Sequence, residues 1–268
     1  MQRKLLLKIP IIKRLYPSVL RRLLKLLKLN RRLWKIKNFK MCLDFLDSVD
    51  REIILKNEYE PKQIDYFLKH AKNNKINQII DVGSNCGYFS FYMANNIPDV
   101  KIHAFEPIPE VYSRFTETIN ASEGRIKKNI KHLNFGLSDK KSTVTMALPI
   151  KNNFIGTGGA RFVNYDYKPT VNEFIKQVEF QRGDNLFTST NQMWGLKIDV
   201  EGHELNTLKG LGSFLLSNKV FIQIEIFDKN FEKVNDYLSK KNFSVISQIE
   251  DSSKTDYFYS NFKVSNQI

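Results

Sequence analysis

Cysteine is scarce in this sequence, and long apolar runs are missing. Only two cysteines, Cys42 and Cys86, occur among 268 residues, which excludes a framework of disulfides and makes a reducing cytosol the simplest compartment. No apolar run reaches the roughly 18–20 residues that a membrane-spanning helix needs, and the N-terminus lacks the apolar core of a signal peptide. These absences predict a cytoplasmic protein. Because 42% of its residues are hydrophobic, the chain has enough apolar material for a sizeable core.

Acidic residues are absent from residues 1–40, which contain 14 Lys and Arg. The other 28 Lys and Arg are balanced by 28 Asp and Glu, so the formal net charge of +14 belongs to this N-terminal arm. A neutral body is a poor match to a fold that grips a polyanion. Nucleic acid is therefore not the partner that we expect.

The arm contains a predicted basic amphipathic helix over residues 18–37, with Ser18 as its N-cap. Cations fill most of the positions between its apolar residues. The apolar residues fall near one face at helical spacing and are Leu20, Leu23, Leu24, Leu27 and Trp34. Such a helix matches one that lies on an anionic membrane surface, here the inner face, without crossing it. A helix packed on the body and a tail that binds a polyanion are the alternatives.

Short apolar runs alternate with helical stretches from residue 61 onward. The predicted helices cover residues 61–74, 89–95, 110–120 and 204–216. The predicted strands cover residues 78–82, 101–105, 132–137, 196–200 and 220–227, with further strand-like runs at 143–148, 178–182, 243–249 and 257–259. This alternation predicts an α/β fold with a mostly parallel, Rossmann-like sheet between two layers of helices.

The sequence predicts that the chain has three segments. They are the basic arm over residues 1–40, a lead-in helical segment over 41–75 and a catalytic domain over 76–268. Residues 149–176 are the least regular part and are expected to form a loop over the sheet edge.

A glycine-containing loop, Gly83-Ser84-Asn85-Cys86-Gly87, joins the first strand of the sheet to a helix. Glycines permit a sharp turn and a close approach of a ligand, and the helix begins with free N–H groups. Glu106 follows the second strand, where a carboxylate can accept hydrogen bonds from both hydroxyls of a ribose. Strand, glycine loop, helix, strand and acid in this order predict a nucleoside cofactor. A tight turn without a ligand is the alternative.

The cofactor is distinguished by what the loop lacks. Tyr88 stands where the dinucleotide pattern needs its third glycine, and no Walker lysine is present. The spacing Asp81-x-Gly83-x-x-x-Gly87 suits S-adenosylmethionine, which has no phosphates, and Asp81 would help to position its amino-acid end.

The candidate catalytic residues follow a later strand, at the carboxyl edge where ligands gather in open α/β sheets. They are Asp199, Glu201 and His203. A hydroxyl acceptor needs alignment and a proton acceptor, and His203 titrates near neutral pH. Lys197 is expected to be the buried partner of Asp199. Structural capping roles are the alternatives.

Glu225, within the neighbouring apolar strand, is a further functional candidate, because an unpaired buried carboxylate is costly. Asp199, Glu201 and Glu225 could also supply oxygen ligands to a metal. No established metal spacing supports that rival, and no metal is predicted.

The chain resembles the FkbM-type family of class I S-adenosylmethionine-dependent methyltransferases over roughly residues 60–230. The segments that carry the resemblance are IIDVGSNCGYFSFYMA (79–94), HAFEPIPEVYSRF (103–115), LNFGLSD (133–139), VEFQRGDNL (178–186), LKIDVEGHELNTLKG (196–210) and IQIEIF (222–227). The resemblance implies a seven-stranded sheet whose last strand is antiparallel. Family members usually have Leu-Asp where this chain has Gly183-Asp184.

The expected cofactor-binding residues combine the loop, the acid and the segments that the resemblance adds. They are Asp81, Gly83, Ser84, Asn85, Gly87, Glu106, Pro107, Ser138 and Asp139. The resemblance places Ser138 and Asp139 near the adenine.

The expected function is methyl transfer from S-adenosylmethionine to a hydroxyl of a sugar, glycan or secondary metabolite. Asp199-Val-Glu-Gly stands where amino-methylating enzymes of nucleic acids have Asn/Asp-Pro-Pro-aromatic, which favours an oxygen acceptor. An RNA or protein methyltransferase that holds its substrate with the basic arm is the alternative. A third hypothesis, a non-catalytic binding module, conflicts with the intact glycine loop and Glu106.

Overall fold

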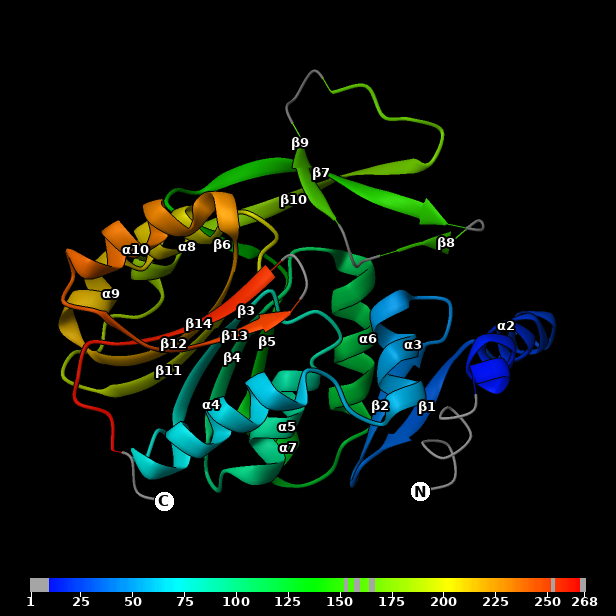
Figure 1. Ribbon diagram of the computed structural model, residues 1–268, viewed down its shortest axis with the longest axis horizontal. Helices are drawn as coiled ribbons and strands as arrows, with labels where there is room; N and C mark the ends of the chain where they lie inside the picture. The colour runs from blue at the N-terminus through cyan, green and yellow to red at the C-terminus, as the bar shows by residue number, and fades with distance from the viewer. Residues whose placement is uncertain (1–9, 152–153, 157–159, 164–166, 252–253, 266–268) are drawn as a thin grey trace.

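The computed structural model describes residues 10–151, 154–156, 160–163, 167–251 and 254–265. Its centre is a seven-stranded sheet with the order β13-β14-β12-β11-β3-β4-β5 (Figure 1). The strands are β3 (Gln78–Val82), β4 (Lys101–Phe105), β5 (Ile130–Leu133), β11 (Met193–Ile198), β12 (Lys219–Phe227), β13 (Ser244–Asp251) and β14 (Lys254–Ser260).

The five strands from β5 to β12 are parallel, and β14 pairs antiparallel with both β12 and β13. The predicted mostly parallel, seven-stranded sheet with an antiparallel last strand is therefore confirmed. The strand bounds predicted for β3 and β4 are confirmed as well.

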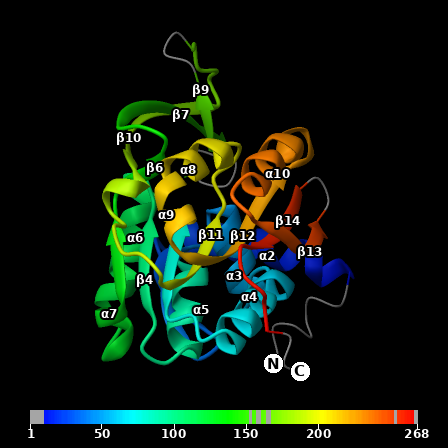
Figure 2. The same cartoon turned by 90° about the vertical axis from the view of Figure 1, so that its left-hand side faces the viewer.

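Helices cover both faces of this sheet (Figures 1 and 2). One layer contains α4 (Pro61–Asn73), α5 (Tyr88–Asn96), α6 (Pro109–Asn120) and α7 (Arg125–Asn129). The other layer contains α8 (Glu204–Gly210), α9 (Gly212–Ser217) and α10 (Phe231–Ser239). Successive strand residues point to opposite faces, so Ile79 belongs to the first core cluster and Ile80 to the second.

The segment around Gly183 packs against the start of α9. A Cβ at Gly183 would lie 2.5 Å from Leu211 Cδ2, which explains why a small residue is needed there. The Asp184 carboxylate accepts hydrogen bonds from the backbone N–H groups of Ser213 and Phe214, both at 3.0 Å. The Gly-Asp pair is thus a packing and capping element at the start of α9.

A second sheet lies above one end of the first (Figure 1). It has the order β6-β10-β7-β8, with β9 paired to β7. Its strands are β6 (Gly136–Ser138), β7 (Ser142–Lys151), β8 (Phe154–Ile155), β9 (Arg161–Val163) and β10 (Glu173–Arg182), with η1 (Gly183–Asn185) after it. The expected irregular loop over 149–176 is wrong where strand pairing extends into it, whereas residues 167–172 are in neither a helix nor a strand. Residues 152–153, 157–159 and 164–166 lie outside the description.

Two predicted elements are divided in the structure. The strand expected over 132–137 is two strands, since β5 ends at Leu133 and β6 begins at Gly136. The helix expected over 204–216 is likewise split into α8 and α9 at Leu211. The first break lets the chain leave one sheet and enter the other.

The N-terminal region begins with α2 (Pro10–Leu26), followed by β1 (Arg31–Ile36), β2 (Phe39–Asp44) and α3 (Ser48–Lys56). The helix predicted over 18–37 is wrong beyond Leu26, because residues 31–36 pair antiparallel with residues 39–44. Its predicted start is wrong as well, because α2 begins at Pro10 and Ser18 lies inside it. Trp34 and Ile36 are both buried, and this alternation suits a strand. The predicted boundary at residue 40 falls inside β2.

None of the helices in the described ranges is both long enough and apolar enough to cross a membrane.

Candidate active site

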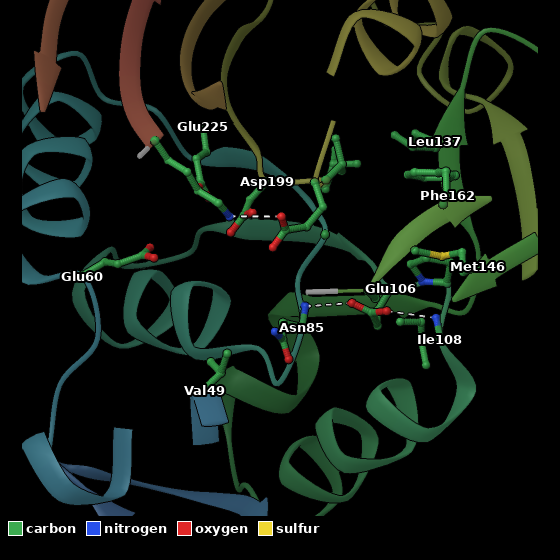
Figure 3. A pocket seen from close by; sticks show the side chains of 18 of the residues that line it. Val49, Glu60, Asn85, Glu106, Ile108, Leu137, Met146, Phe162, Asp199 and Glu225 are labelled. Carbon is green, nitrogen blue, oxygen red and sulfur yellow. Dashed lines mark hydrogen bonds and ion pairs between the residues drawn. The ribbon is translucent and has the colours of Figure 1, made fainter. Parts of the chain in front are cut away.

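A cavity opens at the carboxyl ends of β3, β4, β11 and β12 (Figure 3). Of the predicted site residues, Gly83, Asn85, Glu106, Pro107, Asp199 and Glu201 line it. The described lining does not include Asp81, Ser84, Gly87, Ser138, Asp139 or His203. The remaining lining divides into an apolar end and an end rich in carboxylates, which we call the nucleoside half and the acceptor half.

Glu106 is the central residue of the nucleoside half. Its Oε2 accepts a hydrogen bond from Asn85 N at 3.0 Å, and its Oε1 accepts one from Ile108 N at 2.9 Å. Burial raises the pKa of Glu106 to about 7, although these two backbone hydrogen bonds oppose the rise. Each carboxylate oxygen retains a further lone pair, so Glu106 can still accept two hydroxyl hydrogen bonds.

Apolar side chains complete the nucleoside half. They are Ile108, Leu137, Met146, Ala160, Phe162 and Phe180, from the start of α6 and from the second sheet and the residue before β9. Several of them gather beside Glu106 in Figure 3. Asn85 Oδ1 is buried and has no hydrogen-bond partner among the described residues. An apolar lining, a carboxylate with lone pairs to spare and an unsatisfied amide oxygen together fit a nucleoside with a short polar chain.

The two loop glycines are required by the protein's own backbone and core. Gly83 has φ +78°, and a Cβ there would lie 1.9 Å from the Asp199 carbonyl oxygen. This contact brings the end of β3 against the end of β11, where Asp199 N donates to Val82 O at 3.0 Å. Gly87 has φ +85° and faces the Phe115 ring. The glycine motif therefore also couples the two halves of the cavity.

Asp81 lies beneath the cavity. Ser90 Oγ donates to Asp81 Oδ2 at 2.6 Å, and the carboxylate is fully buried. Burial raises its pKa, and the charge of Lys197 opposes that rise. Asp81 thus contributes to the charge balance under Asp199.

The acceptor half is a network of carboxylates around two lysines. Lys197 Nζ lies 3.2 Å from Asp199 Oδ2, as the sequence predicts. Lys254 Nζ, from β14, lies 3.1 Å from Glu201 Oε2 and 2.9 Å from Glu225 Oε1. A cation thus already stands between these two carboxylates. In the described parts of the chain, no group of three or more His, Cys, Asp or Glu side chains is arranged to hold a metal ion.

The acceptor carboxylates do not ionise independently. Burial tends to raise the pKa of Asp199, but the charges of Lys197 and Lys254 and a hydrogen bond from Glu225 together hold that pKa below its usual value. Burial and the charge of Asp199 raise the pKa of Glu225 to about 9. Like charges at close range cannot all ionise, so Asp199 carries the negative charge and Glu225 retains a proton at neutral pH.

Glu60 was not predicted from the sequence. It lines the cavity from the start of α4, and its carboxylate points toward Asp199 in Figure 3. Burial, followed by the charge of Asp199, raises its pKa to about 7. Its backbone is left-handed, with φ 42° and ψ 52°, although the following Pro61 favours an extended residue. Such strain of about 1–3 kcal/mol persists where the surroundings impose it, often at functional sites.

Two other non-glycine cavity residues, Asn85 and Glu201, also have left-handed backbones, with φ 49° each. No local pattern reveals Glu60 or Lys254, because both reach the cavity only through tertiary structure. The one local feature of the sequence at this strained residue is the proline that follows it, Pro61.

His203 packs against the second sheet. Its ring stacks on Phe162 with 4.5 Å between centroids, and its Nε2 lies 2.9 Å from Ser138 Oγ. Ser138 Oγ in turn donates to Asp139 Oδ1 at 3.0 Å. Burial lowers the pKa of His203, which favours the neutral ring. His203, Ser138 and Asp139 therefore form one cluster behind the apolar lining, and the catalytic role of His203 stays a prediction.

Comparisons with known proteins find methyltransferases. The chain is 29% identical over 168 residues to the hexuronic acid methyltransferase AglP of Haloferax volcanii, covering 62% of each protein. It is 27% identical over 159 residues to the methyltransferase sdnD of Sordaria araneosa, covering 50% of this chain and 60% of that protein. The chain thus spans somewhat less than two thirds of these relatives.

A solved structure, the methyltransferase FkbM from Methylobacillus flagellatus, matches with a TM-score of 0.47 and 13% identity, covering 78% of this chain and 52% of that one. The family model of the methyltransferase FkbM domain matches residues 81–245, which is more than half of the chain. The resemblance seen in the sequence is thereby confirmed, and the chain belongs to the FkbM methyltransferase domain family.

Proposed function

We propose that the protein is an S-adenosylmethionine-dependent O-methyltransferase that acts on a hydroxyl of an uncharged sugar or similar polyol. The observation that carries this proposal is the division of one cavity into a nucleoside half and a carboxylate-rich acceptor half. Glu106 would hold the ribose hydroxyls, and Ile108, Met146 and Phe162 would enclose the adenine. When bound, S-adenosylmethionine supplies an electrophilic methyl group on a sulfonium.

The acceptor half would orient hydroxyl groups and remove a proton. Carboxylates such as Asp199 and Glu201 accept hydrogen bonds from hydroxyls, and Lys254 keeps Glu201 and Glu225 in place. Glu60 is suited to be the proton acceptor, because a general base is most effective when its pKa lies near the working pH. Asp199 is less suited, since Lys197 stabilises its charged form.

The charge of the acceptor half indicates the class of acceptor. Its cavity wall presents five carboxylates and one ammonium group: Glu60, Asp199, Glu201, Glu225 and Asp256 against Lys254. Lys197, beside Asp199, adds a second positive charge. Both lysines are already paired with carboxyl groups of this wall, so a neutral polyol, which needs hydrogen bonds and no counter-charge, fits better than a uronate or a nucleic-acid phosphate. The hexuronic acid in one relative's name therefore supports a carbohydrate acceptor in general.

The first test is calorimetry with S-adenosylhomocysteine and with NAD. We expect S-adenosylhomocysteine to bind and NAD to give no heat. Binding of NAD with no response to S-adenosylhomocysteine would overturn the cofactor assignment.

The second test is transfer of labelled methyl groups to neutral oligosaccharides, uronic-acid oligosaccharides and RNA. We expect the label in the neutral oligosaccharides, in an alkali-stable form, because methyl ethers resist base. An alkali-labile label in the uronic-acid pool would mean a methyl ester on a carboxyl group. Label in RNA alone would favour the nucleic-acid alternative and contradict the proposal.

A further inference from the structure

The helix α2 has two apolar stripes, of which only one is covered by the rest of the protein. Leu24 is buried, and Leu20 packs against the same core cluster. The other stripe remains exposed, although its spacing of four and three residues places it along one helix face. Its members and their exposed fractions are Leu15 56%, Val19 62%, Leu23 50% and Leu26 80%.

Cations border the exposed stripe on the side away from the covered one. Arg22 and Lys25 are exposed and follow the stripe along the helix, and Lys28 is exposed just beyond its end. Residues 1–40 contain no acidic residue that could neutralise them. The helix lies at the periphery of the molecule, beside β1 and α3 (Figure 1). Its exposed side therefore combines apolar area with positive charge.

We infer that the exposed stripe of α2 docks on an anionic lipid bilayer, with Arg22, Lys25 and Lys28 at the headgroups. A bilayer satisfies both properties of the surface, since leucines enter the acyl boundary while cations meet anionic headgroups. A second copy of the chain would bring two acid-free arms together, and RNA would leave the leucines in water. This inference does not rest on the proposed chemistry.

The test is co-sedimentation of the full chain with vesicles of phosphatidylcholine, with and without phosphatidylglycerol. The chain should sediment with the anionic vesicles, and less so at high salt. The double variant Leu23→Glu/Leu26→Glu should lower the partition coefficient about tenfold or more, because each leucine that enters the bilayer contributes strongly to binding. The control is Leu216→Glu on α9. Its exposed fraction, 62%, lies between those of Leu23 and Leu26, and this variant should bind like the unaltered chain.

The cations that border the stripe are tested separately. Each cation near an anionic surface contributes about fivefold to partitioning, so Arg22→Glu/Lys25→Glu should lower binding by at least that factor. Lys209→Glu/Lys233→Glu, exposed lysines on α8 and α10, is the control. Circular dichroism and S-adenosylhomocysteine binding verify that each variant is folded. Equal sedimentation of stripe and control variants, no binding to anionic vesicles, or preferential binding to polyuridylate would overturn the inference.

Discussion

The two halves of the cavity are built in different ways. The nucleoside half centres on Gly83, Asn85 and Glu106, which lie within one short stretch, and its carboxylate is held by two backbone N–H groups. The acceptor half draws Glu60, Glu201 and Lys254 from distant parts of the chain. Lys254 pairs with Glu201, and Glu60 and Glu201 both have left-handed backbones. The nucleoside half thus centres on a local motif, whereas the acceptor half has none.

Electrostatics also separates the halves. Glu106 owes its raised pKa chiefly to burial. Glu60 and Glu225 owe theirs to burial and to the neighbouring charge of Asp199. Removing a charge should therefore impair binding in one half, whereas in the other it should impair turnover and relieve repulsion.

The largest expected effect is on the acceptor half alone. Glu60→Gln should lower turnover about 10²–10⁴-fold, because it removes the proton acceptor. Affinity for S-adenosylhomocysteine should stay the same in calorimetry. Turnover of the unaltered chain should rise with pH through about 7, where Glu60 loses its proton, and the variant should lack this rise. Glu58→Gln, two residues earlier, is the control; equal turnover in the two variants would remove Glu60 from the mechanism.

The next largest effect is expected on ligand binding in the nucleoside half. Glu106→Ala should weaken S-adenosylhomocysteine binding by about 1–3 kcal/mol, since it removes the ribose acceptor. Glu106→Gln, which keeps one acceptor oxygen, should lose less. Affinity of the unaltered chain should fall as pH drops below about 7, because Glu106 then gains a proton. Glu110→Ala on α6 serves as control, and a loss of the same size there would show a general effect on folding.

The repulsion between carboxylates in the acceptor half should make the free energy of unfolding depend on pH. The raised pKa of Glu60 means that the folded state prefers the protonated form, so its contribution is complete below about pH 4.5 and is lost as pH rises through about 7. Glu60→Gln should therefore raise the free energy of unfolding by about 3 kcal/mol at pH 8.5 and hardly at all near pH 4.5. Urea unfolding at both values measures this difference. A gain of equal size at both would assign it to causes other than charge.

The smallest effect on turnover is expected outside both halves. His203→Ala removes a ring that packs on Phe162 and contacts Ser138, so we expect turnover to fall less than about tenfold while stability decreases. Steady-state kinetics and thermal unfolding of the variant check this. A loss of about 10²-fold or more with unchanged stability would instead identify His203 as the proton acceptor.

Local patterns predicted what local structure determines. The strands β3 and β4, the glycine turn and the Lys197–Asp199 pair each depend on residues close in sequence, and all were predicted. The helix expected over 18–37 failed because Leu33, Trp34 and Ile36 suit either period in so short a run. Pairing with residues 39–44 decides in favour of a strand, and that partner is not visible in the run itself.

The missed site residues depend on topology. In the register of β12 and β14, Glu225 lies opposite Asp256 and Phe227 opposite Lys254. Only the antiparallel placement of β14 brings Lys254 to the carboxylates of the acceptor half. Glu60 depends on a strained turn before Pro61, which extended-residue preferences at that position would not predict.

The position of β14 has a consequence for how the protein folds. Although β14 follows β13 in sequence, it lies between β12 and β13. Until β14 is inserted, β12 presents an apolar edge with unpaired backbone groups, the kind of edge that templates aggregation. The strand that completes the acceptor half therefore also protects the chain from self-association, and a nascent chain that has not yet reached residue 254 would be prone to aggregate.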